Sequence, residues 1–169
     1  FSVPNATLPE GTTGTHIFVR CEHDVEIRGY SLSLSYDPLD LAVTEVTTAG
    51  TSAEHAEYAY GQQNAGKVSY GVVLDLMPPN TKTLGCPSGG TADHTLLRLA
   101  VNVLAASPKV IPVTFKDQDI SVAGDPPTRK AWNALVDETG NNVTLQLEAG
   151  QITVSPAALP VPPLARAGP

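Results

Sequence analysis

The sequence predicts an all-β protein, an antiparallel β-sandwich, and three observations lead to that prediction. Apolar and polar residues alternate over many short segments, which is the pattern of strands with one buried face. The 15 prolines and 14 glycines suit the many turns that join short strands. Hydrophobic residues make up 41% of the 169 residues, which is enough to build the core of one domain.

The first two strands are expected at residues 15–21 and 29–36. In the first, every second residue is apolar, and His16 falls on the opposite, outward face. In the second, serines occupy one face and large side chains occupy the other, namely Tyr30, Leu32, Leu34 and Tyr36. Asp37-Pro38 ends this strand, because proline lacks a backbone donor and restricts the residue before it.

The same alternation places the remaining strands, and one segment does not follow it. Further strands are expected at residues 41–46, 56–60, 67–76, 96–104, 109–116, 142–147 and 151–154. Residues 129–136 lack the period of a strand and are expected to form a short helix or a decorated loop. No helix is expected between the strands, which favours an antiparallel sandwich.

The charge balance excludes some partners and says little about fold. The formal net charge is −7 and only 16% of residues are charged, so no basic patch is available to neutralise nucleic-acid phosphates. No apolar run approaches the roughly 18–20 residues that span a bilayer. The chain begins Phe1-Ser2-Val3 without a methionine, so we expect a cleaved leader or an excised module of a secreted or cell-surface protein.

The two cysteines permit one disulfide. A Cys21–Cys86 bond would close a long loop and would stabilise the fold by roughly 4 kcal/mol on a chain-entropy model. The alternative is a buried free thiol at Cys21, because this residue alternates inward with Ile17 and Val19. We expect the disulfide and keep the free thiol as the alternative.

One block of residues resembles a known family. The stretch Gly29-Tyr-Ser-Leu-Ser-Leu-Ser-Tyr-Asp-Pro, followed by Leu41-Ala-Val-Thr-Glu-Val, is similar to a cohesin domain, in which an alternating strand precedes Tyr-Asp-Pro and Leu-x-Val-Thr-x-Val. Residues 66–71, 97–101 and 147–154 agree with later strands of the family in the same order. The resemblance spans residues 1–155 and implies a jelly-roll sandwich of about nine strands. Residues 156–169 would then form an extended Pro-rich tail.

The same resemblance implies a non-catalytic binding module. Cohesins of cellulosomes hold a dockerin module through one sheet face, with an Asn and an Asp on the strand before Tyr-Asp-Pro. Counting back from Tyr36, these positions are Gly29 and Ser31 here, so the family's hydrogen-bonding side chains are missing. A polar, solvent-facing sheet around Ser31, Ser33 and Ser35 would favour such a receptor for another extracellular protein.

The sequence offers two other kinds of candidate site. Asp117, Asp119 and Asp125 are a candidate calcium site, since clustered oxygen ligands suit a hard cation, although acids of this kind also occur in ordinary turns. No other cofactor and no catalytic arrangement is predicted. Tyr58, Tyr60 and Trp132 are candidates for stacking on sugar rings, and an exposed aromatic row would favour polysaccharide binding over simple packing.

The tail suggests a third role. Leu159, Val161 and Leu164 alternate with prolines, which fix φ and reduce the entropy lost when an extended segment docks. We therefore expect a self-assembling subunit of an extracellular filament or coat, in which the tail packs on the neighbouring copy. The N-terminal strand at residues 1–8 could pair with the neighbour in the same way. The alternative is a tail that wraps its own domain or links to a following one.

Overall fold

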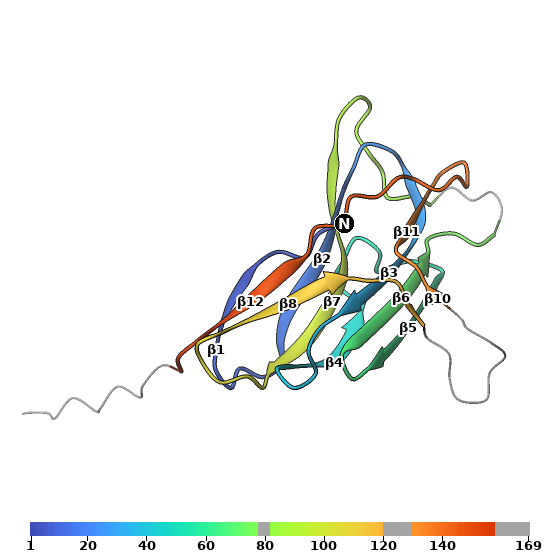
Figure 1. The fold of residues 1–169 in the computed structure, drawn as a ribbon. Coiled ribbons are helices and arrows are strands. Elements are labelled where there is room, and N and C mark those ends of the chain that lie inside the picture. The colour runs from blue at the N-terminus through green and yellow to red at the C-terminus, as the bar shows by residue number, and fades with distance from the viewer. Residues whose placement is uncertain (78–81, 120–129, 158–169) are drawn as a thin grey trace, which may run out of the picture.

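The computed structural model describes residues 1–77, 82–119 and 130–157, which form two packed β-sheets (Figure 1). No helix occurs in these described residues. The larger sheet has the strand order β1 (Ala6–Pro9), β12 (Gly150–Ser155), β8 (Lys109–Phe115), β3 (Ile27–Ser35), β6 (Lys67–Val73) and β5 (Tyr58–Asn64), and β11 (Ala134–Asp137) pairs beside β3. The smaller sheet has the order β2 (Thr15–His23), β7 (Ala92–Val103) and β4 (Leu41–Thr47).

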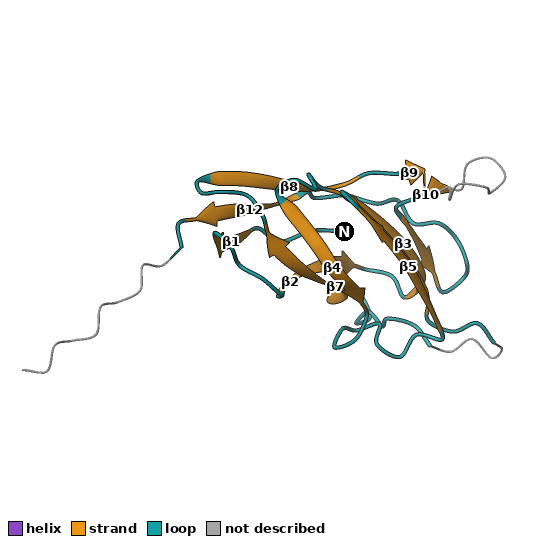
Figure 2. Cartoon of the chain, turned by 90° about the horizontal axis from the view of Figure 1, so that it is seen from below, coloured by secondary structure: helices purple, strands orange, loops and turns teal. Residues whose placement is uncertain are grey.

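A short two-stranded ribbon completes the described part of the chain. It consists of β9 (Gln118–Asp119) and β10 (Lys130–Ala131) and lies on the side of β3 that faces away from the smaller sheet (Figure 2). The parallel pair β1–β12 is the exception to antiparallel pairing among the named strands. The predicted antiparallel sandwich is therefore confirmed. Nothing in the described residues forms a helix that is long and apolar enough to span a membrane.

The core lies between the two sheets and follows the alternation of the sequence. In β3 the inward side chains Tyr30, Leu32 and Leu34 are buried, as predicted. In β2 the inward positions are buried and His16 is exposed, also as predicted. In β7 both Leu96 and Leu97 are buried, because the register against β2 shifts at that point and breaks the strict alternation.

A hydrogen bond across the core joins the two sheets. The hydroxyl of Tyr30 on β3 donates to the carbonyl oxygen of Leu96 on β7 at 2.8 Å. Burial raises the pKa of Tyr30 above its ordinary value, so the hydroxyl keeps its proton and remains a donor. This contact fixes the two sheets relative to each other at one point.

The N-terminal segment packs within its own domain at the edge of the larger sheet, and its pairing with a neighbouring copy stays a prediction. Phe1 and Val3 are buried in the core, and Ser2 forms β-bridges with Arg20 and Glu148. The strand β1 then pairs with β12 along its whole length. The apolar side chains of this segment are therefore used in its own fold, while β1 remains the edge strand of the larger sheet.

Two expected elements are different in the structure. Residues 142–147 are not a strand, since they contain one isolated bridge, Val136 to Asn142. Their alternation arises because Val143 and Leu145 pack against the core while the backbone has no continuous partner strand. Residues 130–137 form β10 and β11 rather than a short helix.

The two cysteines are free thiols in this structure, so the predicted Cys21–Cys86 disulfide is not formed in it. Cys21 points into the core, and burial raises the pKa of its thiol to about 11. The sulfur of Cys86 lies 3.0 Å from the carbonyl oxygen of Gly90 and 3.4 Å from that of His23. The thiol of Cys86 thus faces its own turn and the β2 backbone, and the alternative of a buried free thiol at Cys21 describes this structure.

Two histidines stack beside this turn. The rings of His23 and His94 lie 5.0 Å apart between centroids. Nδ1 of His23 donates to the carbonyl oxygen of Val25 at 2.5 Å, and its Nε2 is buried without a partner among the described residues. Burial therefore lowers the pKa of His23, because a proton on Nε2 would carry a buried charge and an unsatisfied donor.

Several predicted features lie outside the described residues. They are Asp125 of the candidate calcium site and the three tail residues Leu159, Val161 and Leu164. The last described strand, β12, ends at Ser155. The division into a sandwich at 1–155 and a tail at 156–169 stays a prediction.

Candidate functional site

The outer face of β5, β6 and β3 carries a groove with aromatic walls. On β5 the side chains of Tyr58 and Tyr60 point outward, because the alternate position, Gly61, faces inward under the ring of Tyr70. That ring lies so close to Gly61 that a Cβ would not fit. Glycine at this position lets β5 approach β6 over an inward aromatic ring.

Small residues make the floor of the groove. Ser31 on β3 and Ser69 and Gly71 on β6 face the same way as the two tyrosines. A Cβ at Gly71 would contact nothing within 4 Å, so the space above this residue is open. At Gly29 a Cβ would lie 2.9 Å from the carbonyl oxygen of Val72, so glycine is required there by the close approach of the backbones.

The groove consists of two hollows that meet at Ser31, Tyr58 and Gly71. One has a volume of about 540 Å³ and extends between β3, β6 and β11 toward Leu76 and Val136. The other, of about 240 Å³, lies between Tyr60 and Trp132. The two hollows therefore adjoin each other on the outer face of the sheet.

Trp132 forms the wall opposite Tyr60, and hydrogen bonds to β3 hold it there. The hydroxyl of Ser31 donates to the carbonyl oxygen of Trp132 at 2.5 Å. The backbone N–H of Ser33 donates to Oδ1 of Asn133 at 2.8 Å. Lys130 adds a cation–π contact, with Nζ 5.6 Å from the centre of the Trp132 ring.

Asn133 is itself held by Asp117. Its backbone N–H and its side-chain Nδ2 donate to Oδ1 of Asp117, at 2.9 and 3.1 Å. Asp117 therefore acts in this structure as an acceptor that orients the groove wall. Asp119 lies on β9 opposite Lys130, and Asp125 is outside the described residues, so the calcium site stays a prediction.

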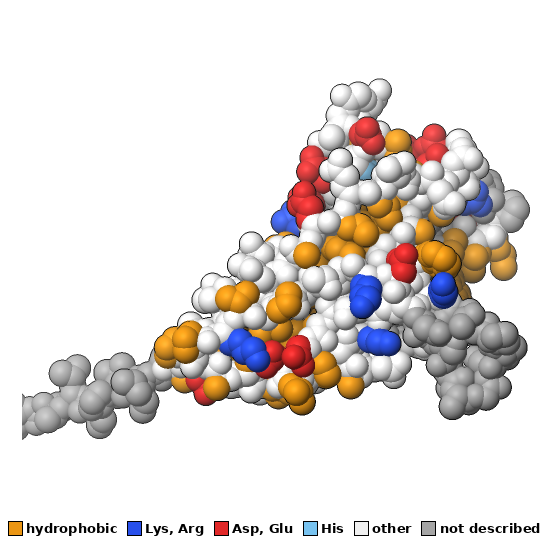
Figure 3. Space-filling view, viewed as in Figure 1, with side chains coloured by type: hydrophobic (Ala, Val, Ile, Leu, Met, Phe, Trp, Pro, Cys, Tyr) orange, Lys and Arg blue, Asp and Glu red, His pale blue; other side chains and the backbone are white. Residues whose placement is uncertain are grey.

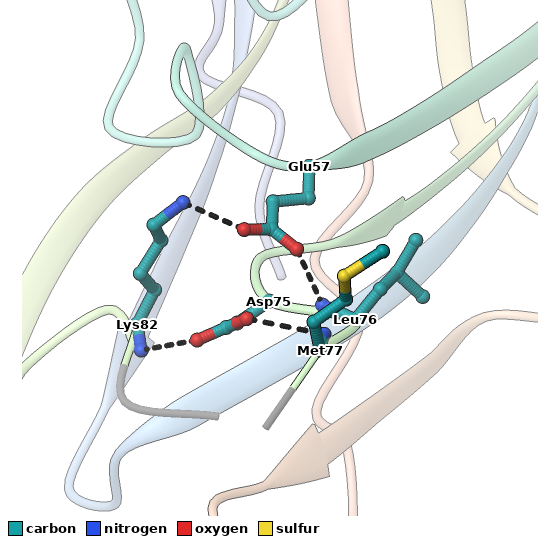
Figure 4. Close-up of polar contacts among 5 residues, drawn as sticks. All are labelled: Glu57, Asp75, Leu76, Met77 and Lys82. Carbon is teal, nitrogen blue, oxygen red and sulfur yellow. Dashed lines mark hydrogen bonds and ion pairs between the residues drawn. The ribbon is translucent and has the colours of Figure 1, made fainter. Parts of the chain in front are cut away.

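Figure 4 shows the polar contacts that fix the other end of the groove. Lys82 Nζ donates to Glu57 Oε1 at 2.9 Å, and the Leu76 N–H donates to Glu57 Oε2 at 2.9 Å. The two oxygens of Asp75 accept the backbone N–H groups of Met77 and Lys82 at 3.3 and 3.2 Å. The hydrogen bond from Lys82 is the largest cause that lowers the pKa of Glu57, so the carboxylate stays charged and keeps both contacts.

The three aromatic residues proposed for sugar stacking come together around this groove. Tyr58, Tyr60 and Trp132 are 49, 54 and 55% exposed, and they are joined on the rim by Leu76. Hydrophobic side chains gather on the part of this face near β6 and β10, beside Lys or Arg side chains (Figure 3). An exposed aromatic group is therefore present.

The polar face expected around the serines of β3 is only partly exposed. Ser33 is fully buried, and its backbone bonds to Asn133 and Lys116. Ser31 lies in the floor of the groove. The open, flat, polar sheet that would have favoured a receptor of the family's usual kind is thus replaced by a walled groove.

Sequence reasoning missed the residues that shape this groove. The sequence patterns do not single out Gly71 or Asn133, and they place Lys130 only in an irregular segment. Glycines at Gly61 and Gly71 inside two neighbouring strands were an available signal, because glycine within a strand often marks a close approach or a ligand.

The comparisons with known proteins bear on the fold. No protein-family model and no curated protein matches the chain. Among solved structures, a type I cohesin–dockerin complex from Clostridium thermocellum is similar at a TM-score of 0.68 and 14% identity, over 91% of this chain and 96% of that chain. A non-cellulosomal cohesin from Archaeoglobus fulgidus is similar at 0.61 and 17%, over 90% of this chain and 88% of that one.

A third similar structure is a type II cohesin domain from the cellulosome of Acetivibrio cellulolyticus. It gives a TM-score of 0.59 and 15% identity, over 87% of this chain and 90% of that chain. Since these likenesses span most of both chains, the predicted cohesin-like fold is confirmed.

Proposed function

We propose that this chain is a non-catalytic interaction module of an extracellular or cell-surface protein, and that it binds a protein partner through the groove between Tyr60 and Trp132. The observation that supports this most directly is the set of exposed aromatic side chains around an open floor. Tryptophan and tyrosine dominate the binding energy of many interfaces, because they bury large areas at low entropic cost.

The surroundings of the groove suit a specific partner. Leu76 and Met77 continue the apolar surface at one end, at 54 and 72% exposure. Lys130 and Gln62 give the other end a polar edge. An apolar centre with a polar edge is the usual anatomy of a protein interface. Similar folds occur in complexes between a cohesin and a dockerin, which makes another protein module a reasonable partner class.

Gly71→Leu is the sharpest test, because a side chain there fills the floor without meeting any atom within 4 Å of its Cβ. The matched control is Gly85→Leu, at an exposed position away from the groove with equally open space. We would measure binding to a panel of dockerin modules by biolayer interferometry. A partner whose affinity falls at least tenfold with Gly71→Leu alone supports the proposal, and a partner unaffected by Gly71→Leu contradicts it.

Polysaccharide is the second candidate, and the meeting of Tyr58, Tyr60 and Trp132 at one groove favours it. Planar rings of this kind stack on the apolar faces of sugars. Trp132 is the only tryptophan of the chain, so its fluorescence reports directly on the groove. Saturable quenching by a soluble oligosaccharide, lost in Gly71→Leu, would favour this candidate over a protein partner.

Self-assembly into a filament or coat remains part of the proposal, through the Pro-rich segment or the N-terminal edge strand β1. Light scattering and negative-stain microscopy of the chain with and without residues after Pro156 test it. Ordered polymers that form only when the Pro-rich segment is present support assembly. Monomers both with and without the segment exclude it.

A further inference from the structure

We infer that the Pro-rich segment 156–169 of one copy of this chain occupies the aromatic groove of a second copy. The inference rests on the proposed function, because it uses the same groove, and it names what fills it. It follows from the chemistry of the segment, the chemistry of the groove and the distance between them.

The sequence of the segment favours a polyproline II conformation. Pro160, Pro162 and Pro163 fall within four residues, and Leu159 and Leu164 flank them. A polyproline II helix makes no internal hydrogen bonds, so its carbonyl groups remain available as acceptors. Because its backbone is already restricted, it loses little conformational entropy on docking.

The groove offers what such a segment needs, namely flat aromatic walls with hydrogen-bond donors. Among the described residues the Trp132 indole N–H and the Tyr58 hydroxyl have no hydrogen-bond partner. The Tyr60 hydroxyl oxygen accepts a hydrogen bond from Gln62 at 3.1 Å, which leaves its own proton to donate. Aromatic-lined grooves with such donors are the general means of binding Pro-rich segments.

The strand registers place the groove of the same copy beyond the reach of the prolines at 160–163. Ser35 is opposite Thr114, and Val154 is opposite Lys109, so Ser155 lies beyond the end of β3 along the sheet. Counting along these registers, Ser155 is about ten residues from the level of Ser31, or about 33 Å at about 3.3 Å per residue. The eight residues from Ser155 to Pro163 reach at most about 29 Å.

Figure 1 shows the same separation, with the end of β12 at one end of the molecule and β5, β6 and β10 at the other. A segment that leaves one end and binds at the opposite end of the next copy makes a head-to-tail contact. Repeated contacts of this kind give open chains. The groove and the segment thus account together for assembly without a second surface.

A complementation experiment tests the inference on the full chain. The groove variant is Gly71→Leu and the segment variant combines Pro160→Ala with Pro162→Ala. We expect the unchanged chain to form larger species as its concentration rises in light scattering, while each variant alone stays monomeric. An equal mixture of the two variants retains one intact groove and one intact segment per pair, so it should form 1:1 dimers and nothing larger.

A peptide of residues 156–169 supplies an independent readout. It should quench Trp132 fluorescence saturably in the unchanged chain. The affinity read from this quenching should be at least tenfold lower in Gly71→Leu, and Gly85→Leu should behave like the unchanged chain. The inference is overturned if the peptide leaves the fluorescence unchanged, or if both variants assemble like the unchanged chain. A different result is that the peptide fails to bind while Gly71→Leu still abolishes binding of a dockerin module or a glycan. That result would remove only this occupant and would leave the proposed binding groove standing.

Discussion

Asn133→Ala tests how the groove is built. The side-chain oxygen of Asn133 accepts the backbone N–H of Ser33 at 2.8 Å, and Ser33 is 0% exposed. Alanine leaves this buried donor without its acceptor, which costs about 1–3 kcal/mol. For a chain of this size each kcal/mol lowers Tm by about 2–4 °C, so we expect a decrease of about 2–12 °C.

Thermal unfolding followed by circular dichroism measures the loss, and Trp132 fluorescence shows where it occurs. Because residue 133 holds the wall that carries Trp132, the variant should also increase quenching of Trp132 by acrylamide. Asp117→Asn is the control, since it keeps an oxygen that can accept both hydrogen bonds from Asn133. It should stay within about 0.5 kcal/mol of the unchanged chain. An Asn133→Ala variant with unchanged Tm and unchanged quenching would refute the reasoning.

Three further predictions concern the core, a turn and the pH dependence. Tyr30→Phe removes the 2.8 Å hydrogen bond to Leu96 and should cost about 0.5–1.5 kcal/mol in urea unfolding, whereas Tyr60→Phe on the groove should cost less than about 0.5 kcal/mol. Equal losses would contradict the assignment of inner and outer faces. Gly66→Ala should cost about 1–3 kcal/mol in the same assay, because Gly66 has φ +79° and a Cβ there would lie 2.9 Å from a backbone oxygen; an unchanged midpoint would contradict this. His23 has a lowered pKa in the folded state, so stability should be complete above about pH 6.5 and should fall as the pH drops from there toward the folded-state pKa. His23→Gln should reduce that slope between pH 8 and pH 5, and an identical slope would show that another group titrates.

Much of the sandwich could be predicted, because strand alternation is a local property. Residues 15–21 and 29–36 were expected as strands, and the structure has Thr15–His23 and Ile27–Ser35. The prediction failed at 142–147, where alternation reflects packing against the core without a continuous partner strand. Alternation reports which side chains face inward, and it does not report whether a neighbouring strand is present.

The candidate site was predictable only in part. The sequence pointed to Tyr58, Tyr60 and Trp132 as possible contact residues, but not to the groove between them. The disulfide between Cys21 and Cys86 was expected from an even cysteine count, yet in this structure the Cys21 side chain turns into the core and that of Cys86 faces the carbonyl oxygens of its own turn. Cysteine number limits the possible bonds, and the directions of the side chains decide which are made.

The sequence by itself determined the fold class and which side chains of a strand face the core, since both follow from the two-residue repeat of an extended backbone. Tertiary structure alone decided that Trp132 stands opposite Tyr60. The hydrogen bond that fixes this wall joins Ser31 to Trp132 across 101 residues of chain. Its formation depends on β11 pairing beside β3 and on Asp117 holding Asn133, and contacts between such distant residues leave no periodic trace in the sequence.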